Sequence, residues 1–76
     1  MSDSPEYEKR VQGILKAELK RRGVTYAQLA EKLAGMGIEE AEPNIRNKLA
    51  RGKFSAAFFV ECLTAIGATT LRLESD

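Results

Sequence analysis

The side chains best suited to chemistry in this sequence lie between residues 44 and 51. Asn44, Asn47 and Arg51 carry amide and guanidinium groups, and Arg46 and Lys48 add two cations. An asparagine amide can bond adenine through two hydrogen bonds, and an arginine guanidinium can do the same to guanine. Flanking cations can reach phosphate oxygens. This set suits a surface that reads DNA, but a solvated helix face often carries the same residue types, so both interpretations stay open at this point.

Catalysis and metal binding have little support in the sequence. It contains no histidine and one cysteine, Cys62, so a zinc site would need carboxylates alone, which is an unusual ligand set. Cys62 stands among apolar residues at helical spacing, which predicts a buried thiol and not a nucleophile. Glu39 and Glu40 are neighbours in a loop and build no pocket. We therefore expect no enzymatic activity, no cofactor and no small-molecule substrate.

Two helices are indicated before these residues. Ser4 as N-cap and Pro5 at the first helical position predict a helix that ends just before Gly23. Thr25 and Gln28 form a capping-box pattern that opens a second helix, which two glycines end. Apolar residues at spacings of three and four predict their buried sides: Tyr7, Val11, Ile14, Leu15 and Leu19 in the first, and Tyr26, Leu29, Ala30 and Leu33 in the second.

Two further helices follow a connector at residues 38–41. The third begins at Glu42-Pro43 and ends at Gly52, and the fourth is capped by Ser55 and closed by Gly67. The apolar side of the fourth helix holds Phe58, Phe59, Cys62, Leu63 and Ile66. Phe54 and Phe58 either complete the core or, with Met36, provide a surface for self-association. Four short helices with brief connections predict a compact all-α domain.

The third helix presents its polar residues outward. At about 100° per residue, Ile45 and Leu49 define its buried side, and Asn47 points the opposite way. The rest of the outward face and its edges consist of Asn44 and Arg51 beside Asn47, Ala50 on the flank, and Arg46 and Lys48 at the two edges.

Three segments resemble the lambda-repressor/Cro (XRE) type of helix-turn-helix family. Leu19–Leu33 resembles its opening, with a basic turn and glycine followed by a capped helix that holds an alanine, Ala30, where the two motif helices cross. Asn44–Gly52 resembles the recognition helix, and Cys62–Gly67 resembles the last core helix. The stretch Leu19–Gly67 is also similar to a family of short, uncharacterised bacterial proteins predicted to share this fold.

The resemblance implies a transcriptional regulator from a bacterium or phage that binds double-stranded DNA as a homodimer. It places helix 43–51 in the major groove and a helix-turn-helix domain at residues 6–67, between an acidic tail (1–5) and a C-terminal tail (68–76). For the C-terminal tail three alternatives stay open: a strand that pairs with the same strand of a second chain, a segment packed on the helices, or a frayed end. The bases would be read by Asn44, Asn47, Arg51, Arg46 and Lys48, and the phosphates would be bound by Thr25, Gln28, Arg22 and Lys53.

Three features depart from the family pattern. The connection between the second and third helices is four or five residues longer, and Tyr26 stands where the family usually has a phosphate-binding glutamine. Three glutamates precede the third helix: Glu39, Glu40 and Glu42. They would repel phosphates unless the loop turned away or they paired with Arg46 or Lys48. The alternative is a protein-interaction module of the same fold with little or no DNA binding, or an antitoxin or accessory protein that answers to a regulatory protein partner.

The charges are divided along the chain. It has 12 Lys and Arg against 11 Asp and Glu, but five of the acids lie in residues 1–8 and 74–76. Residues 9–73 therefore hold all 12 cations against 11 − 5 = 6 acids, a net charge of +6. Such a basic body attracts a polyanion, although an ordinary solvated surface is an equal reading of the charge alone. The polar first ten residues and the short apolar runs predict a cytoplasmic protein with no membrane partner.

Overall fold

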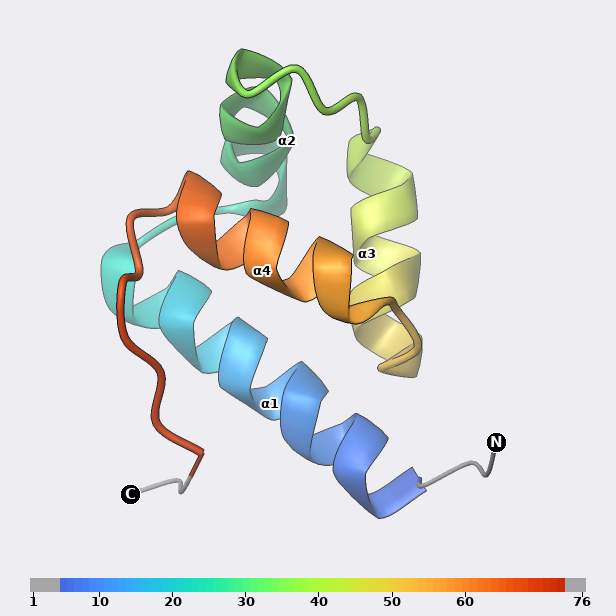
Figure 1. Cartoon of the computed structure of the whole chain (residues 1–76). Helices are drawn as coiled ribbons and strands as arrows, with labels where there is room; N and C mark the ends of the chain where they lie inside the picture. Colours follow the sequence, from blue (N-terminus) through green and yellow to red (C-terminus); the bar gives the residue numbers. More distant parts are fainter. Residues whose placement is uncertain (1–4, 74–76) are drawn as a thin grey trace.

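Four helices make up the computed structural model, which describes residues 5–73 (Figure 1). They are α1 (Pro5–Arg22), α2 (Tyr26–Gly35), α3 (Glu42–Arg51) and α4 (Ala56–Ala65). Residues 5–73 contain no strand. The all-α prediction is therefore confirmed, and no helix of this part of the chain is long and apolar enough to cross a membrane.

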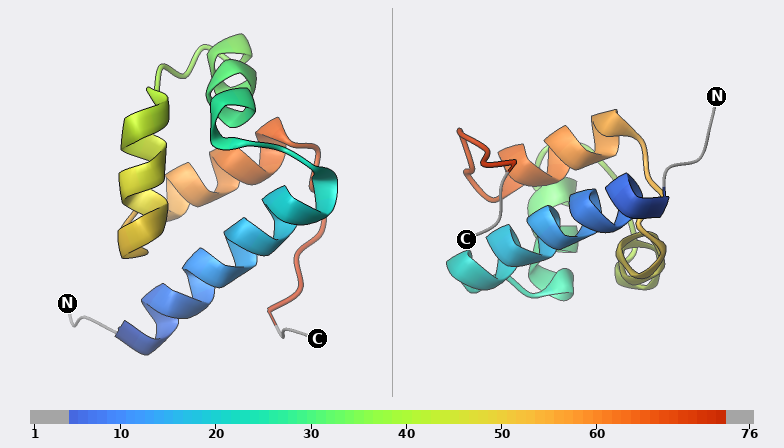
Figure 2. Two further views of the ribbon diagram at one scale, coloured as in Figure 1. Left: turned by 180° about the vertical axis from the view of Figure 1, so that it is seen from behind. Right: turned by 90° about the horizontal axis from the view of Figure 1, so that it is seen from below.

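The two later helices are each held by both earlier ones. α3 packs on α1 and α2, and α4 packs on α1 and α2. In Figure 1, α4 lies alongside α1, and α3 stands at the end of this pair where α1 begins. The chain reverses direction between α2 and α3 through residues 36–41 (Figure 2). The long connector predicted from the sequence is thus present, and both helices still share one core.

The core draws residues from all four helices. Its fully or nearly fully buried members are Leu15, Leu19, Leu29, Leu33, Ile45, Leu49, Phe58, Cys62 and Leu63. Burial of each large apolar side chain stabilises the fold by about 1.5–3 kcal/mol. The expected burial of Tyr7 was wrong, because its side chain is 57% exposed near the start of α1. Phe58 belongs to the core and Phe54 packs edge-on against it at 5.6 Å between ring centroids.

The predicted helix ends are largely confirmed. Thr25 and Gln28 form both bonds of the capping box at the start of α2, and the Ser55 side chain accepts a hydrogen bond from the Phe58 backbone N–H at the start of α4. The predicted N-cap Ser4 lies outside the described residues. These local bonds satisfy backbone N–H groups that a helix start leaves without partners.

The segment after α4 packs on the helices and forms no strand over residues 68–73. The backbone N–H of Ala68 donates to the carbonyl of Leu63 at 2.9 Å, and Ala68 packs against the core. The chain then runs back along α1 (Figures 1 and 2). Packing on the helices is thus found at Ala68, whereas residues 69–73 are exposed. Pairing of this tail with a second copy stays a prediction, and residues 74–76 lie outside the described part of the chain.

Candidate nucleic-acid interface

The outward face of α3 has the predicted composition. Ile45 and Leu49 are completely buried, whereas Asn44, Asn47 and Arg51 are exposed. Within residues 5–73, no hydrogen bond or ion pair engages the side chains of these three residues. Their donors and acceptors are therefore available to a partner such as the edge of a base pair.

The C-terminal end of α3 is fixed to α1 by contacts that the sequence did not reveal. The Gln12 side chain donates hydrogen bonds to the backbone carbonyls of Leu49 and Ala50, the latter at 2.9 Å. Gly52 follows with φ 69°, and a Cβ there would lie 2.8 Å from the backbone oxygen of Glu8. A helix that reads bases needs a fixed position on its scaffold, and these contacts supply it.

The two cations at the edges of α3 are paired with glutamates. Arg46 forms an ion pair with Glu42 at 2.5 Å, and its guanidinium lies 5.8 Å from the Tyr26 ring centroid. Lys48 pairs with Glu40 at 2.7 Å. The pairing offsets the repulsion that these glutamates would exert on phosphates. It is one of the two arrangements that the sequence analysis named as compatible with DNA binding. It also lowers the net positive charge that Arg46 and Lys48 bring to this surface.

Two of the predicted phosphate-binding residues lie at the start of α2. The Thr25 hydroxyl accepts a hydrogen bond from the Gln28 backbone N–H at 3.1 Å, and the Gln28 side-chain oxygen accepts one from the Thr25 N–H at 2.9 Å. The Thr25 hydroxyl proton and the Gln28 side-chain amide remain as donors. Both side chains are exposed, so their bonds to each other hold the α2 start rigid and leave donors facing solvent.

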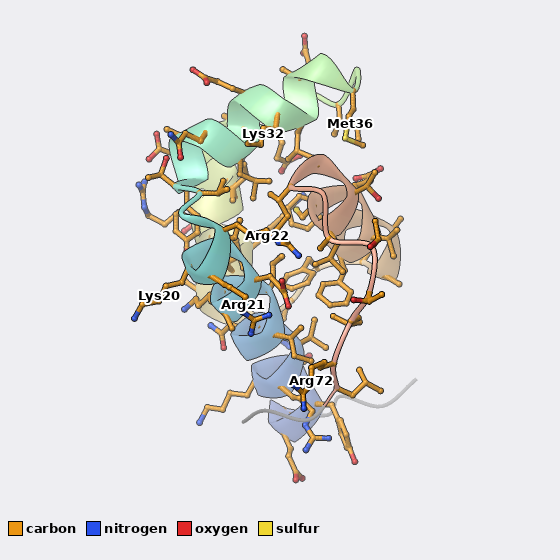
Figure 3. The ribbon with its side chains drawn as sticks, turned by 90° about the vertical axis from the view of Figure 1, so that its left-hand side faces the viewer. Lys20, Arg21, Arg22, Lys32, Met36 and Arg72 are labelled. Carbon is orange, nitrogen blue, oxygen red and sulfur yellow. The ribbon has the colours of Figure 1, made fainter. Side chains whose placement is uncertain are left out.

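Lys16 and Lys20 are functional candidates that the sequence analysis missed. Together with Thr25 and Tyr26 they line a shallow hollow at the start of α2. Lys20 extends away from the protein (Figure 3). The two lysines stand four residues apart on α1, so they share one face of that helix. This spacing is visible in the sequence, but the proximity of that face to Thr25 depends on how α1 and α2 are joined.

The other two predicted phosphate contacts are engaged within the protein. The Arg22 Nε lies 3.4 Å from the Glu18 carboxylate, and the Lys53 Nζ lies 3.2 Å from the Glu8 carboxylate. Neither residue lines the hollow beside Thr25. The pair of Lys53 with Glu8 lies at the surface and is weak, at about 0–1 kcal/mol, so a phosphate could still compete for Lys53. Arg22 faces the buried carboxylate of Glu18, so it is less available to a phosphate.

The structure therefore brings together only part of the predicted site. The contact between Arg46 and Tyr26 joins α3 to the start of α2, and Ala50 lies within about 40° of Arg46 around α3. Asn47 is equally far from both edges of the outward face, and Asn44 and Arg51 lie toward the Lys48 edge. Lys48 lies on the opposite edge, over the Phe58 ring of α4 at 4.4 Å. The surface nearest to the lysines of α1 thus excludes Lys48.

The buried cysteine has the chemistry of a core residue. Cys62 is completely buried. Desolvation, together with the nearby Glu61 carboxylate, raises the pKa of its thiol from 9.0 to about 12. The predicted role of Cys62 as a small apolar core residue is thus confirmed.

Comparison with known proteins gives one match. No curated protein and no solved structure matches the chain. The model of one family, described as a domain of unknown function (DUF6471), matches residues 7–71. This range includes all of α2, α3 and α4 and nearly all of α1, and the chain therefore belongs to the DUF6471 family.

Proposed function

We propose that this protein is a sequence-specific DNA-binding regulator that places α3 in the major groove. The observation that carries the proposal is the outward face of α3, where Asn44, Asn47 and Arg51 are exposed on a helix fixed to α1. Asparagine and arginine are the side chains that recognise adenine and guanine through paired hydrogen bonds. The resemblance to the XRE type of helix-turn-helix family supports the same role.

Phosphate binding would come from the region beside α3. Thr25 and Gln28 keep donors at the start of α2, and Lys16 and Lys20 supply positive charge beside Thr25. Contacts of this kind position a protein on the duplex without reading its sequence. In this proposal Arg46 contributes from the near edge of α3, after exchange of Glu42 for a phosphate. The protein binds nucleic acid and catalyses no reaction on it.

Fluorescence anisotropy with a labelled mixed-sequence duplex tests the proposal. Binding is expected to weaken as salt rises from about 50 to 300 mM, with a log–log slope equivalent to several phosphate contacts. Selection of bound sequences from a random library should then yield a preferred site. The variant Asn47→Ala should weaken that preference, since it removes one base contact. Absence of binding at the lowest salt would reject the proposal.

A protein-interaction module of the same fold is the second candidate. The pairs Glu42–Arg46 and Glu40–Lys48 favour it, because they neutralise both edges of α3. Charge reversal distinguishes the candidates. Glu40→Lys should strengthen DNA binding, since it removes an acid and releases Lys48, whereas a protein partner that needs this neutral edge would bind less tightly. Unchanged DNA affinity in Glu40→Lys would count against the DNA proposal.

A further inference from the structure

A glycine in the middle of α1 has no explanation within residues 5–73. Gly13 lies inside the 18-residue helix, where glycine costs about 1 kcal/mol relative to alanine. Apart from its chain neighbours and the adjoining backbone of its own helix, no atom of the described residues lies within 4 Å of the place that a Cβ would take, so the protein itself does not require glycine there. Close approach of another backbone is one of the reasons for which proteins retain glycine.

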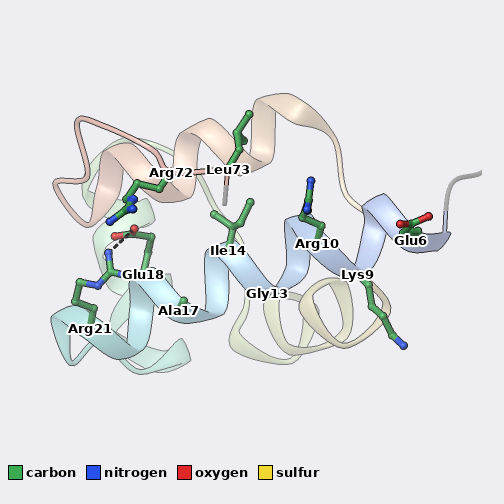
Figure 4. A pocket seen from close by; sticks show the side chains of 10 residues that line it. All are labelled: Glu6, Lys9, Arg10, Gly13, Ile14, Ala17, Glu18, Arg21, Arg72 and Leu73. Carbon is green, nitrogen blue, oxygen red and sulfur yellow. Dashed lines mark hydrogen bonds and ion pairs between the residues drawn. The ribbon is translucent and has the colours of Figure 1, made fainter. Parts of the chain in front are cut away.

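Gly13 lies in a groove of about 510 Å³ between α1 and the C-terminal segment (Figure 4). Ile14 and Ala17 join Gly13 in its apolar floor, and Leu73, which is 64% exposed, borders it from the other side. The α1 residues that line the groove run from Glu6 to Arg21. This face is about 22 Å long at 1.5 Å per residue, which is the length of a helix–helix contact.

A buried carboxylate opens onto the same groove. The Glu18 side chain is only 7% exposed and pairs with Arg21 at 2.8 Å and with Arg22 at 3.4 Å. In Figure 4 the Arg72 side chain also points toward it. The Oε1 atom is buried and accepts no hydrogen bond from the described residues, although the Arg22 Nε lies 3.4 Å from it as an ion-pair partner. An acceptor left in this state is costly, so the groove offers a site for a donor that another molecule would supply.

We propose that a second copy of this chain fills the groove, with the two α1 helices antiparallel about a twofold axis between Gly13 and Ile14. Residues whose numbers add to 27 then face each other at the same level along the two helices. Glu6 lies level with Arg21 of the partner subunit, and Gly13 lies level with Ile14 of the partner subunit. An isologous contact repeats each pair, so two Glu6–Arg21 ion pairs close the two ends of the interface.

The charge distribution of α1 fits this self-pairing. The helix has Glu6 and Glu8 in its first turn and Lys20, Arg21 and Arg22 in its last turn, so antiparallel packing brings opposite charges together and parallel packing brings like charges together. Arg10 lies within one residue of the level of Glu18 of the partner subunit, and its guanidinium supplies the hydrogen bond that Oε1 lacks. Lys9 stands at the edge of the groove, where its charge stays in water.

The resemblance predicts a homodimer without indicating its surface, and the groove supplies that surface. The test needs no DNA, so it succeeds or fails separately from the proposed DNA binding. Sedimentation equilibrium of the full chain at about 1–500 µM should give a reversible dimer. Glu6→Arg should weaken the dimer about tenfold or more, because it places like charges at both ends of the interface. Arg21→Glu should do the same, and since it also breaks the ion pair with Glu18 within the protomer, its stability is compared with that of the wild-type protein by urea denaturation.

The double variant Glu6→Arg/Arg21→Glu decides the question, because it exchanges the two charges and should restore the dimer. Gly13→Leu should be folded, since the monomer has open space there, and should be monomeric, since the side chain blocks the helix contact. Lys32→Glu makes the same kind of charge change on α2 and should leave the dimer intact. Circular dichroism checks that each variant is folded. A monomeric wild-type protein, or a folded double variant that stays monomeric, would overturn the proposal, as would a dimer that Gly13→Leu leaves unchanged.

Discussion

At the scale of single residues, the environment of Cys62 predicts how fast its thiol reacts and how the stability of the protein depends on pH. Its thiol has a pKa of about 12, raised from 9.0 mainly by burial. The folded protein therefore keeps the thiol protonated at a pH where the unfolded chain ionises. The contribution of this thiol to the free energy of unfolding is fully present below the pKa of the unfolded chain. It is lost as the pH rises from about 9 toward 12.

Cys62 should consequently resist modification while the protein is folded. A chromogenic disulfide reagent at about pH 8 should label the native protein at least about a hundredfold more slowly than the protein in guanidinium chloride, because only the exposed thiolate reacts. Complete labelling of the native protein within the time needed by the unfolded chain would show that the thiol is accessible.

Gly52 predicts a large loss of stability on substitution. Its φ of 69° costs an alanine about 1 kcal/mol, and the added Cβ would also lie 2.8 Å from the backbone oxygen of Glu8. Gly52→Ala should therefore lower the free energy of unfolding by about 3 kcal/mol or more. Gly23→Ala is the matched control, because Gly23 has φ 67° and open space around its Cβ position, and it should lose only about 1 kcal/mol. Equal losses in urea denaturation would contradict the close packing of Gly52 on α1.

At the scale of helices, Gln12 is predicted to hold α3 in place. Its side chain bonds the backbone carbonyls of Leu49 and Ala50 in the last turn of α3. Gln12→Met keeps the length of the side chain and removes the donors, so it should destabilise the protein by about 1–2 kcal/mol. Hydrogen exchange should quicken most at the C-terminal turn of α3. Lys16→Met, an exposed substitution on the same helix, is the control and should change the urea midpoint little.

The helices themselves were predictable because their signals are local. The Thr25 capping box and the Ser55 cap depend on residues three positions apart, and their bonds are the ones found. The orientation of α3 was predictable as well, since Ile45 and Leu49 are the apolar positions of a helix whose period is fixed. Asn47 consequently faces solvent, as the periodicity required.

What the sequence did not reveal depends on contacts between distant segments. In the sequence, Gln12 looks like an ordinary surface residue, because its contact with α3 depends on the fold. Glu18 likewise looks solvated, because its burial beside Arg72 of the C-terminal segment depends on the fold. The neighbours Phe58 and Phe59 are both apolar, and only the packing of α4 decides that Phe58 is the more deeply buried. The hollow beside Lys16 likewise exists only once α1 and α2 meet.

At the scale of the whole molecule, the proposed dimer and the proposed DNA surface are compatible. Lys16 precedes Ala17, so it points about 100° around α1 from the floor of the groove. The twofold axis is perpendicular to both α1 helices, so a side chain that points along the axis in one copy points the same way in the other. Lys16 and Lys20 of both copies then face the same side of the dimer. The two α3 helices lie on the outer sides of the α1 pair, because Gln12 joins α3 to the side of α1 away from the groove. DNA across this face would meet an inverted repeat of half-sites.

The lysines and Asn47 should therefore contribute to DNA binding in distinguishable ways. Replacing both Lys16 and Lys20 with alanine should lower the log–log salt slope by about two for each bound protomer, since each phosphate contact contributes about 0.9. Affinity should fall equally for all sequences, because phosphates carry no base information.

Asn47→Ala should keep the log–log salt slope of the wild-type protein and reduce the difference in binding free energy between the preferred sequence and others by about 1–3 kcal/mol. Lys32→Ala removes a cation outside the hollow, although Lys32 lies near Gln28. It serves as the control for charge, and its slope should fall by less than that of the lysine double variant. A slope that the lysine double variant leaves unchanged would mean that DNA runs along another face, whereas a loss of sequence preference in that variant would mean that α1 rather than α3 reads the bases.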